Sequence, residues 1–131
     1  RARTQARLDW IVDMAGLHGF EDALAASLPM GLRQRLALGI ALVHEPKLLF
    51  LDEPTSGMGL EDVAQTAALI RRVARNRTVL MVEHNLGVVA DLADRITVLA
   101  GGSVLTEGTY SEVSGDARVQ EAYIGRKKAK A

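Results

Sequence analysis

The sequence contains no cysteine and no long apolar run. Without cysteine, disulfide bonds and thiolate metal sites are excluded, and a reducing compartment is expected. No apolar run approaches the roughly 18 residues that span a membrane, and the first ten residues, RARTQARLDW, contain no apolar core of a signal peptide. We therefore expect a soluble protein of the cytoplasm. The absence of an initial methionine is compatible with a start inside a longer chain.

Neither sign of charge is in excess, since Lys and Arg together number 16 and so do Asp and Glu. Proteins that bind nucleic acid or membrane surfaces directly usually carry a basic excess, so we expect no direct nucleic acid partner. Basic residues gather near both ends, at Arg1, Arg3 and Arg7 and in GRKKAK (125–130), and we interpret both of these groups as solvated. The length of 131 residues suffices for one ordinary domain with its own core.

Hydrophobic periodicity and turn residues predict helices that alternate with strands. The helices are expected over residues 4–15, 21–26, 32–44, 59–76, 85–94, 110–115 and 116–125. The strands are expected over 47–52 and 77–83, and over 95–100 and 103–108 as a hairpin through Gly101 and Gly102.

This order of elements predicts an α/β fold in which helices cover a parallel or mixed sheet. Residues 1–45 would form a small helical subdomain, and residues 46–131 the sheet core with the C-terminal helices. The strand over 47–52 is short and apolar throughout, which is typical of a strand that is buried on both faces.

The most informative stretch is LLFLDEPTSG (48–57), where an apolar strand ends on Asp52 and Glu53. Ligands of open parallel sheets bind beyond the C-terminal ends of the strands. Asp52 could hold Mg²⁺ there, directly or through water, and Glu53 could polarise the water that attacks a γ-phosphate. The alternative is that the two carboxylates only cap the turn at Pro54, and this stretch alone does not decide between the two interpretations.

The second strand favours the catalytic interpretation. TVLMVEH (78–84) ends at His84, about thirty residues after Glu53. Adjacent parallel strands would bring both side chains out at the same sheet edge, where an imidazole can contact a γ-phosphate and sense its loss. A loop histidine without such a role is the alternative. Before the first strand, Gly31 opens a helix whose free N–H groups could bind an anion, although an ordinary helix start is the favoured explanation of that stretch taken alone.

Taken together, LPMGLRQRLALG, HEPKLLFLDEPTSG and TVLMVEH resemble the ATP-binding cassette family of transporter ATPases. The resemblance covers essentially the whole chain, as the C-terminal half of that nucleotide-binding domain. It implies a P-loop NTPase-like α/β fold, incomplete because the phosphate-loop half is absent. It also implies that ATP and Mg²⁺ are the cofactors, that Asp52 supports Mg²⁺ as the Walker B aspartate, that Glu53 is the catalytic base and that His84 is the switch histidine.

The resemblance further implies contacts with the ATP of the opposite subunit in a head-to-tail dimer. Residues 28–35 match the signature motif, and residues 56–60 match the D-loop at the dimer seam. The binding positions implied in these two segments are Pro29, Met30, Gly31, Leu32, Gln34, Ser56, Gly57 and Gly59.

Three departures from the family pattern stand out. No glycine is followed by Lys-Ser or Lys-Thr, so the phosphate-binding loop is absent, and we expect this chain alone to bind ATP poorly. In the signature, usually L-S-G-G-Q, Pro29 offers neither a hydroxyl nor an N–H, and Met30 adds bulk where glycine lets a backbone approach. Gly59 stands where the D-loop usually carries an aspartate.

Different parts of the chain also resemble two different branches of the family. Residues 28–57 are similar to ATPases of drug exporters and ABC-2-type permeases, and the residues after Gly57 are similar to branched-chain amino acid importer ATPases. This pattern is compatible with a natural sequence that resembles both branches, and also with a recombined sequence.

The leading hypothesis is an ATP-hydrolysing part of a transporter that powers solute movement, with little or no activity unless a phosphate-loop half completes it. The family implies integral membrane permease subunits that handle the small-molecule cargo, and therefore a peripheral place at the cytoplasmic face of the inner membrane. The alternative is a catalytically idle module that docks on a complete cassette. A cassette protein acting on ribosomes or DNA is disfavoured by the neutral charge. Because the sheet would have an open edge, we expect residues 1–131 alone to be marginally stable or to self-associate.

Overall fold

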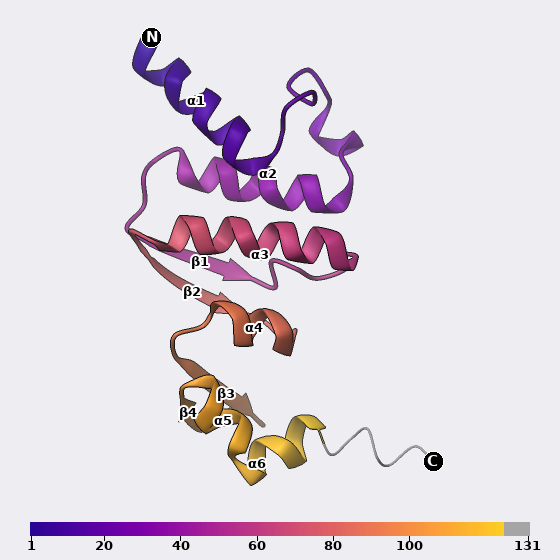
Figure 1. The fold of residues 1–131 in the computed structure, drawn as a ribbon, viewed down its shortest axis with the longest axis vertical. Coiled ribbons are helices and arrows are strands. Elements are labelled where there is room, and N and C mark those ends of the chain that lie inside the picture. The colour runs from indigo at the N-terminus through magenta and orange to yellow at the C-terminus, as the bar shows by residue number, and fades with distance from the viewer. Residues whose placement is uncertain (125–131) are drawn as a thin grey trace. The chain divides into compact units, whose positions relative to one another are not determined.

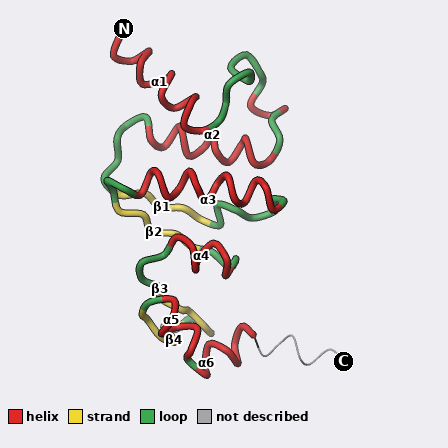
Figure 2. Tube along the Cα trace, in the orientation of Figure 1, coloured by secondary structure: helices red, strands yellow, loops and turns green. Residues whose placement is uncertain are grey.

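The structure, a computed structural model, describes residues 1–124 and divides the chain into two compact units, Arg1–Asn85 and the residues from Leu86 onward. The first unit contains α1 (Ala2–Ala15), the 3-10 turn η1 (Ala25–Ser27), α2 (Met30–Leu42), β1 (Leu48–Asp52), α3 (Leu60–Ala74) and β2 (Thr78–Val82). The second contains α4 (Leu86–Leu92), β3 (Ile96–Ala100), β4 (Ser103–Gly108), α5 (Tyr110–Gly115), α6 (Ala117–Val119) and the π-helical turn η2 (Gln120–Ile124) (Figures 1 and 2).

The first unit is built on a β-α-β motif. Strands β1 and β2 pair in parallel, in register from Leu48 opposite Thr78 to Asp52 opposite Val82, and α3 connects them. Helix α2 packs against both α1 and α3, and Figure 1 shows α2 and α3 running side by side. The predicted pairing of these two strands as parallel neighbours is therefore confirmed.

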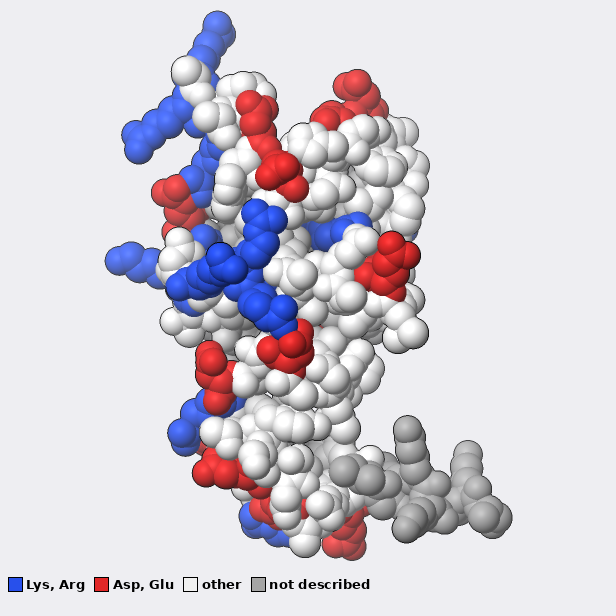
Figure 3. Space-filling view, in the orientation of Figure 1, with Lys and Arg blue, Asp and Glu red and all other residues white. Residues whose placement is uncertain are grey.

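Local signals explain the helices of this unit. Helix α1 ends where Gly16 adopts a left-handed φ of 66°, a conformation that glycine takes at no steric cost. Helix α3 begins with Glu61 and Asp62 and ends with Arg71 and Arg72, which is the charge order that the helix dipole favours. In Figure 3, blue side chains gather over the last turns of α3, in agreement with the basic residues at that end of the helix.

Two-sided burial of the first strand, predicted from its apolar run, is wrong for the described residues. Leu49 is 3% exposed, but its neighbours Leu48 and Phe50 are 47% and 69% exposed. Leu80 and Val82 of β2 are likewise 55% and 60% exposed. Side chains alternate between the two faces of a strand, and within the first unit only one face of this sheet is covered. An apolar run shows that both faces of a strand can be buried, but it does not show that other elements cover both faces.

Several predicted boundaries also need correction. The helix expected over 21–26 is only the 3-10 turn Ala25–Ser27. Helix α2 starts at Met30, two residues earlier than expected, because Pro29 serves as its N-cap. The helix expected over 116–125 is a three-residue α6 followed by the π-helical turn Gln120–Ile124, and its last residue lies outside the described residues, as does the basic stretch 125–130.

The second unit contains the predicted hairpin. Strands β3 and β4 pair antiparallel, and Gly101 and Gly102 both take positive φ angles, 56° and 80°, as a tight hairpin turn requires. Behind the hairpin, Val98, Val113 and Val119 form a buried cluster. In the described residues the strands thus form two two-stranded sheets, one parallel and one antiparallel. None of the helices described in residues 1–124 combines the length and the apolar character needed to cross a bilayer.

Candidate functional site

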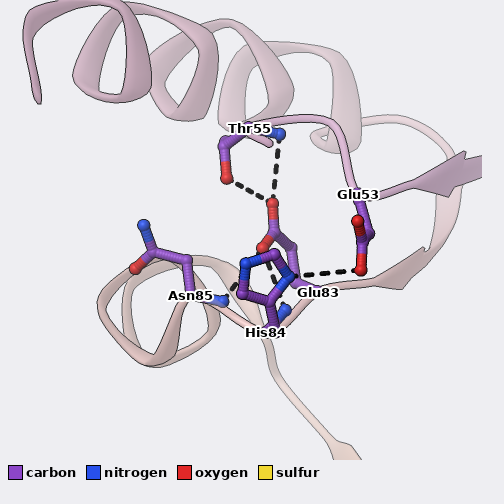
Figure 4. A network of polar contacts seen from close by, with 5 residues as sticks. All are labelled: Glu53, Thr55, Glu83, His84 and Asn85. Carbon is purple, nitrogen blue, oxygen red and sulfur yellow. Dashed lines mark hydrogen bonds and ion pairs between the residues drawn. The ribbon is translucent and has the colours of Figure 1, made fainter. Parts of the chain in front are cut away.

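The candidate site lies where β1 and β2 end together. Because Asp52 pairs with Val82 at the last step of a parallel ladder, the segments after both strands leave at the same sheet edge. The backbone N–H of Glu53 donates a 2.8 Å hydrogen bond to the Val82 carbonyl oxygen, which extends the ladder by one residue. The loop after β1 and the short segment after β2 are therefore adjacent (Figure 4).

Glu53 and His84 meet at this edge. His84 Nδ1 lies 3.2 Å from Glu53 Oε1, and the two side chains are 67% and 47% exposed, respectively. The spatial expectation that both emerge at one sheet edge is confirmed, whereas their catalytic roles stay a prediction. Since Nδ1 faces the carboxylate, Nε2 is the ring nitrogen that remains for a ligand.

The backbone of Glu53 is held in an unusual conformation. Its φ angle is 45°, in the left-handed region that side chains other than glycine rarely occupy. The Ser56 N–H donates to the Glu53 carbonyl oxygen at 3.1 Å, closing a turn directly after the strand. Such conformations persist only where surrounding structure enforces them, and they concentrate at functional sites.

Asp52 is the exposed last residue of β1. Within residues 1–124 there is no group of three or more His, Cys, Asp or Glu side chains that could hold a metal by themselves. The single carboxylate of Asp52 fits Mg²⁺ bound to a nucleotide, because that ion takes one or two protein carboxylates and completes its shell with water and phosphate oxygens. It does not fit a metal site made by protein ligands alone.

Glu83 is the site residue that sequence reasoning missed. Its Oε1 accepts hydrogen bonds from the Thr55 N–H at 3.1 Å and from the Thr55 hydroxyl, and its Oε2 accepts from the N–H groups of His84 at 3.1 Å and Asn85 at 3.0 Å. Burial raises the pKa of Glu83, but the hydrogen bonds from Thr55, Asn85 and His84 outweigh it, so the pKa lies below the usual 4.5. The one signal in the sequence that could have identified Glu83 is its position directly before His84, at the end of the second strand.

The signature segment forms the start of α2. Pro29 is the N-cap and makes no side-chain capping bond. A Cβ atom at Gly31 would lie 2.5 Å from the Asp62 carboxyl group, so a carboxylate from the first turn of α3 covers this helix start. Arg35, one turn further along α2, lies 3.9 Å from that carboxylate. The Asp62 carboxylate thus occupies the position at which a bound anion was expected.

The remaining signature and D-loop positions differ in accessibility. Met30 is 49% exposed, and its Cε lies 3.9 Å from the Cβ position of Gly57, so the two segments meet. Leu32 is buried in a cluster with Ala15, Leu17 and Leu28, which identifies it as a core residue. Positions open to a partner are Ser56, Gly57 and Gly59, while Gln34 is half-buried.

Two family models match the chain. Residues 3–56 match the model described as ABC transporter, and residues 103–129 match the model described as branched-chain amino acid ATP-binding cassette transporter. The second match confirms the predicted importer-like character of the C-terminal region. The methionine import ATP-binding protein MetN 2 of Burkholderia mallei is 33% identical over 120 residues, and MetN 1 of Rhodopseudomonas palustris is 34% identical over 115 residues.

Solved structures agree with these matches. The ADP conformation of an ATP-binding cassette of an ABC transporter superposes with a TM-score of 0.81 at 26% identity, and covers 94% of this chain. A nucleotide-free cassette superposes with a TM-score of 0.83 at 25% identity, and covers 95% of this chain.

The matches extend over nearly the whole chain but over only part of each relative. They span 90% of this chain and 30% of MetN 2 from Burkholderia mallei, and 86% and 31% in the case of MetN 1. Of the two solved cassettes they span 50% and 51%. The P-loop NTPase-like fold predicted from the sequence is that of these cassettes, and the chain belongs to the ATP-binding cassette family of transporter ATPases.

Proposed function

We propose that this chain supplies the catalytic sheet edge of a transporter ATPase, where Glu53 acts as general base and His84 contacts the γ-phosphate of ATP. The observation that carries the proposal is the 3.2 Å contact between these two side chains, beyond the C-terminal ends of two parallel strands. That position is where open α/β sheets bind their ligands.

The chemistry follows from the positions of the three side chains. Glu53 accepts a proton from water as the water oxygen bonds to the γ-phosphorus and the bond to the leaving ADP oxygen breaks. A doubly protonated His84 would donate from Nε2–H to a γ-phosphate oxygen while Nδ1–H donates to the Glu53 carboxylate, so departure of the phosphate removes a hydrogen-bond partner from the ring that contacts the base. Asp52 would hold Mg²⁺, which neutralises charge on the β- and γ-phosphates when bound.

The printed sequence contains no phosphate-binding loop, so hydrolysis requires one from elsewhere. The solved cassettes are about twice as long as the matched part of this chain, which gives room for such a loop. Alone, the chain is expected to bind ATP weakly and to turn it over little or not at all.

The proposed partners are a second cassette in a head-to-tail dimer and integral membrane permease subunits. The exposed Met30, Ser56, Gly57 and Gly59 would face the ATP of the opposite cassette. The permease would select the small-molecule cargo and hold the ATPase at the cytoplasmic face of the inner membrane. Methionine import is what the names of the MetN relatives state of those proteins.

A catalytically idle module that docks on a complete cassette is the second candidate. It is favoured by the start of α2, where Pro29 makes no capping bond and the Asp62 carboxylate covers Gly31. A negative charge at that position opposes the binding of a phosphate. The intact Asp52, Glu53 and His84 speak for the first candidate, since a docking module has no need of them.

The two candidates differ in the effect of Glu53→Gln. In a complete cassette that contains this chain and a phosphate-binding loop, the catalytic proposal expects this substitution to lower ATP turnover by about 100-fold or more. Retained nucleotide binding would show that the variant is folded. Equal, negligible turnover of the parent and the variant would instead establish the docking module.

A further inference from the structure

Glu83 connects the two segments that carry the proposed catalytic pair. Its carboxylate accepts two hydrogen bonds from Thr55, in the loop after β1, and one each from the backbone N–H groups of His84 and Asn85, after β2. In Figure 4 it lies between the two segments, with Thr55 on one side and His84 on the other. We call this set of four hydrogen bonds the Glu83 bridge.

The bridge requires a carboxylate. Two oxygens with four donors use the full acceptor capacity of an ionised carboxyl group. An amide at this position would place an NH₂ group against backbone N–H donors, and an apolar side chain would leave the hydroxyl of Thr55, a residue that is 5% exposed, without its acceptor. Since both oxygens are occupied by donors, Glu83 is not free to take a proton from water.

The bridge lies next to both reacting side chains in sequence. Thr55 is two residues after Glu53, and Glu83 immediately precedes His84. The side chains of Glu53 and His84 are 47% and 67% exposed, and the left-handed backbone conformation of Glu53 needs surrounding structure to enforce it. Surrounding packing therefore does little to fix their contact, whereas the bridge fixes the backbone on either side of it.

We propose that Glu83 is a positioning residue, which sets the relative placement of Glu53 and His84 by holding Thr55 and the His84–Asn85 backbone on one carboxylate. The catalytic consequence rests on the proposed function. The geometric consequence, placement of the His84 ring on Glu53, does not.

The geometric consequence is tested by NMR of backbone amides and of the His84 ring in a complete cassette that contains the chain. Glu83→Gln removes one of the two acceptor oxygens, and Thr55→Val removes only the hydroxyl donor. Thr55→Ser keeps the hydroxyl, and Glu121→Gln repeats the Glu-to-Gln change on an exposed residue of η2; both serve as matched controls.

In Glu83→Gln we expect exchange of the His84 and Asn85 amide protons to become at least about tenfold faster. The His84 Nδ1 resonance should also lose its response to Glu53→Gln, because the ring no longer lies on that carboxylate. Thr55→Val should give a smaller change of the same sign, and Thr55→Ser and Glu121→Gln should match the parent. Faster amide exchange with an unchanged His84 response would overturn the positioning role, as would no change at all.

The catalytic consequence is tested by ATP turnover in a complete cassette that contains the chain. Misplacement of reacting groups costs about 100-fold in rate, so kcat of Glu83→Gln should fall on that order while KM for ATP and the melting temperature stay near the parent values. If KM rises while kcat and the melting temperature both fall, Glu83 is merely structural, and this result would overturn the inference. If Glu53→Gln is as active as the parent, the proposed function fails, and the His84 ring response still decides the positioning role.

Discussion

Gly39 of α2 lies against Ile11 of α1, so closely that a Cβ atom added to Gly39 would stand 2.7 Å from Ile11 Cγ2. Ile11 is only 6% exposed and has little room to move. Gly39→Ala should therefore separate the two helices and lower the free energy of unfolding by about 1–3 kcal/mol, less the roughly 1 kcal/mol that alanine gains over glycine within a helix. Thermal or urea unfolding measures the difference.

A double-mutant cycle with Ile11→Ala identifies the cause of this destabilisation. Ile11→Ala removes Cγ2, so Gly39→Ala should cost less in that background than in the parent. Gly115→Ala is the control, because no atom lies within 4 Å of the Cβ position at Gly115. An equal effect of Gly39→Ala with and without Ile11 would show that the close approach is not the reason.

Asp116 predicts an acid-sensitive contact in the second unit. It caps α6 by accepting from the Arg118 N–H at 2.9 Å, and its carboxylate also accepts from Arg118 Nε at 3.1 Å and Nη2 at 2.7 Å. The side-chain hydrogen bond from Arg118 first, and the backbone N–H second, lower the pKa of Asp116 from 3.8 to about 2. Because the folded pKa is the lower one, this stabilisation is complete above 3.8 and is lost as the pH falls from 3.8 towards 2.

Carbonyl-carbon NMR of the Asp116 side chain measures this titration directly. Arg118→Ala should raise the pKa of Asp116 towards 3.8, but not fully, because the backbone N–H at position 118 remains. Arg95→Ala removes a cation of the same unit that is bonded to Glu107 instead, and should leave the Asp116 pKa unchanged. A titration of Asp116 near 3.8 in the parent would contradict the arrangement.

The sequence was sufficient to predict those features that local signals encode. Gly16 ends α1, Gly101 and Gly102 form the hairpin turn, and the apolar stretches before Glu53 and His84 identify two parallel strands. Parallel neighbours end at one edge, so the meeting of Glu53 and His84 followed from topology without knowledge of any contact.

Glu83 was missed because its importance depends on a distant donor. The local sequence VEHN (82–85) does not show that Thr55, 28 residues earlier, lies within reach of the Glu83 carboxylate. The burial of β1 was misjudged for a related reason, since the periodicity of a strand shows which side chains share a face but not what covers it. Both failures concern tertiary partners, which local patterns do not contain.

The uncovered face of the parallel sheet predicts self-association of residues 1–131. Leu48, Phe50, Leu80 and Val82 expose between 47% and 69% of their surface on neighbouring strands. Contiguous apolar surface of this kind drives association of soluble proteins. Phe50→Ser should therefore shift the chain towards monomer in sedimentation velocity at equal concentration.

The matched control for this prediction is Leu24→Ser, because Leu24 is 78% exposed but lies in the loop before η1 rather than on the sheet. It should leave the association state unchanged, since its exposed side chain is not part of the sheet face. If a partner segment covers the sheet in a complete cassette, Phe50→Ser should there lower the melting temperature instead, because the same side chain becomes part of a core. A monomeric parent chain with a sharp two-state melt at low concentration would refute the prediction, because the exposed sheet face would then be tolerated in water.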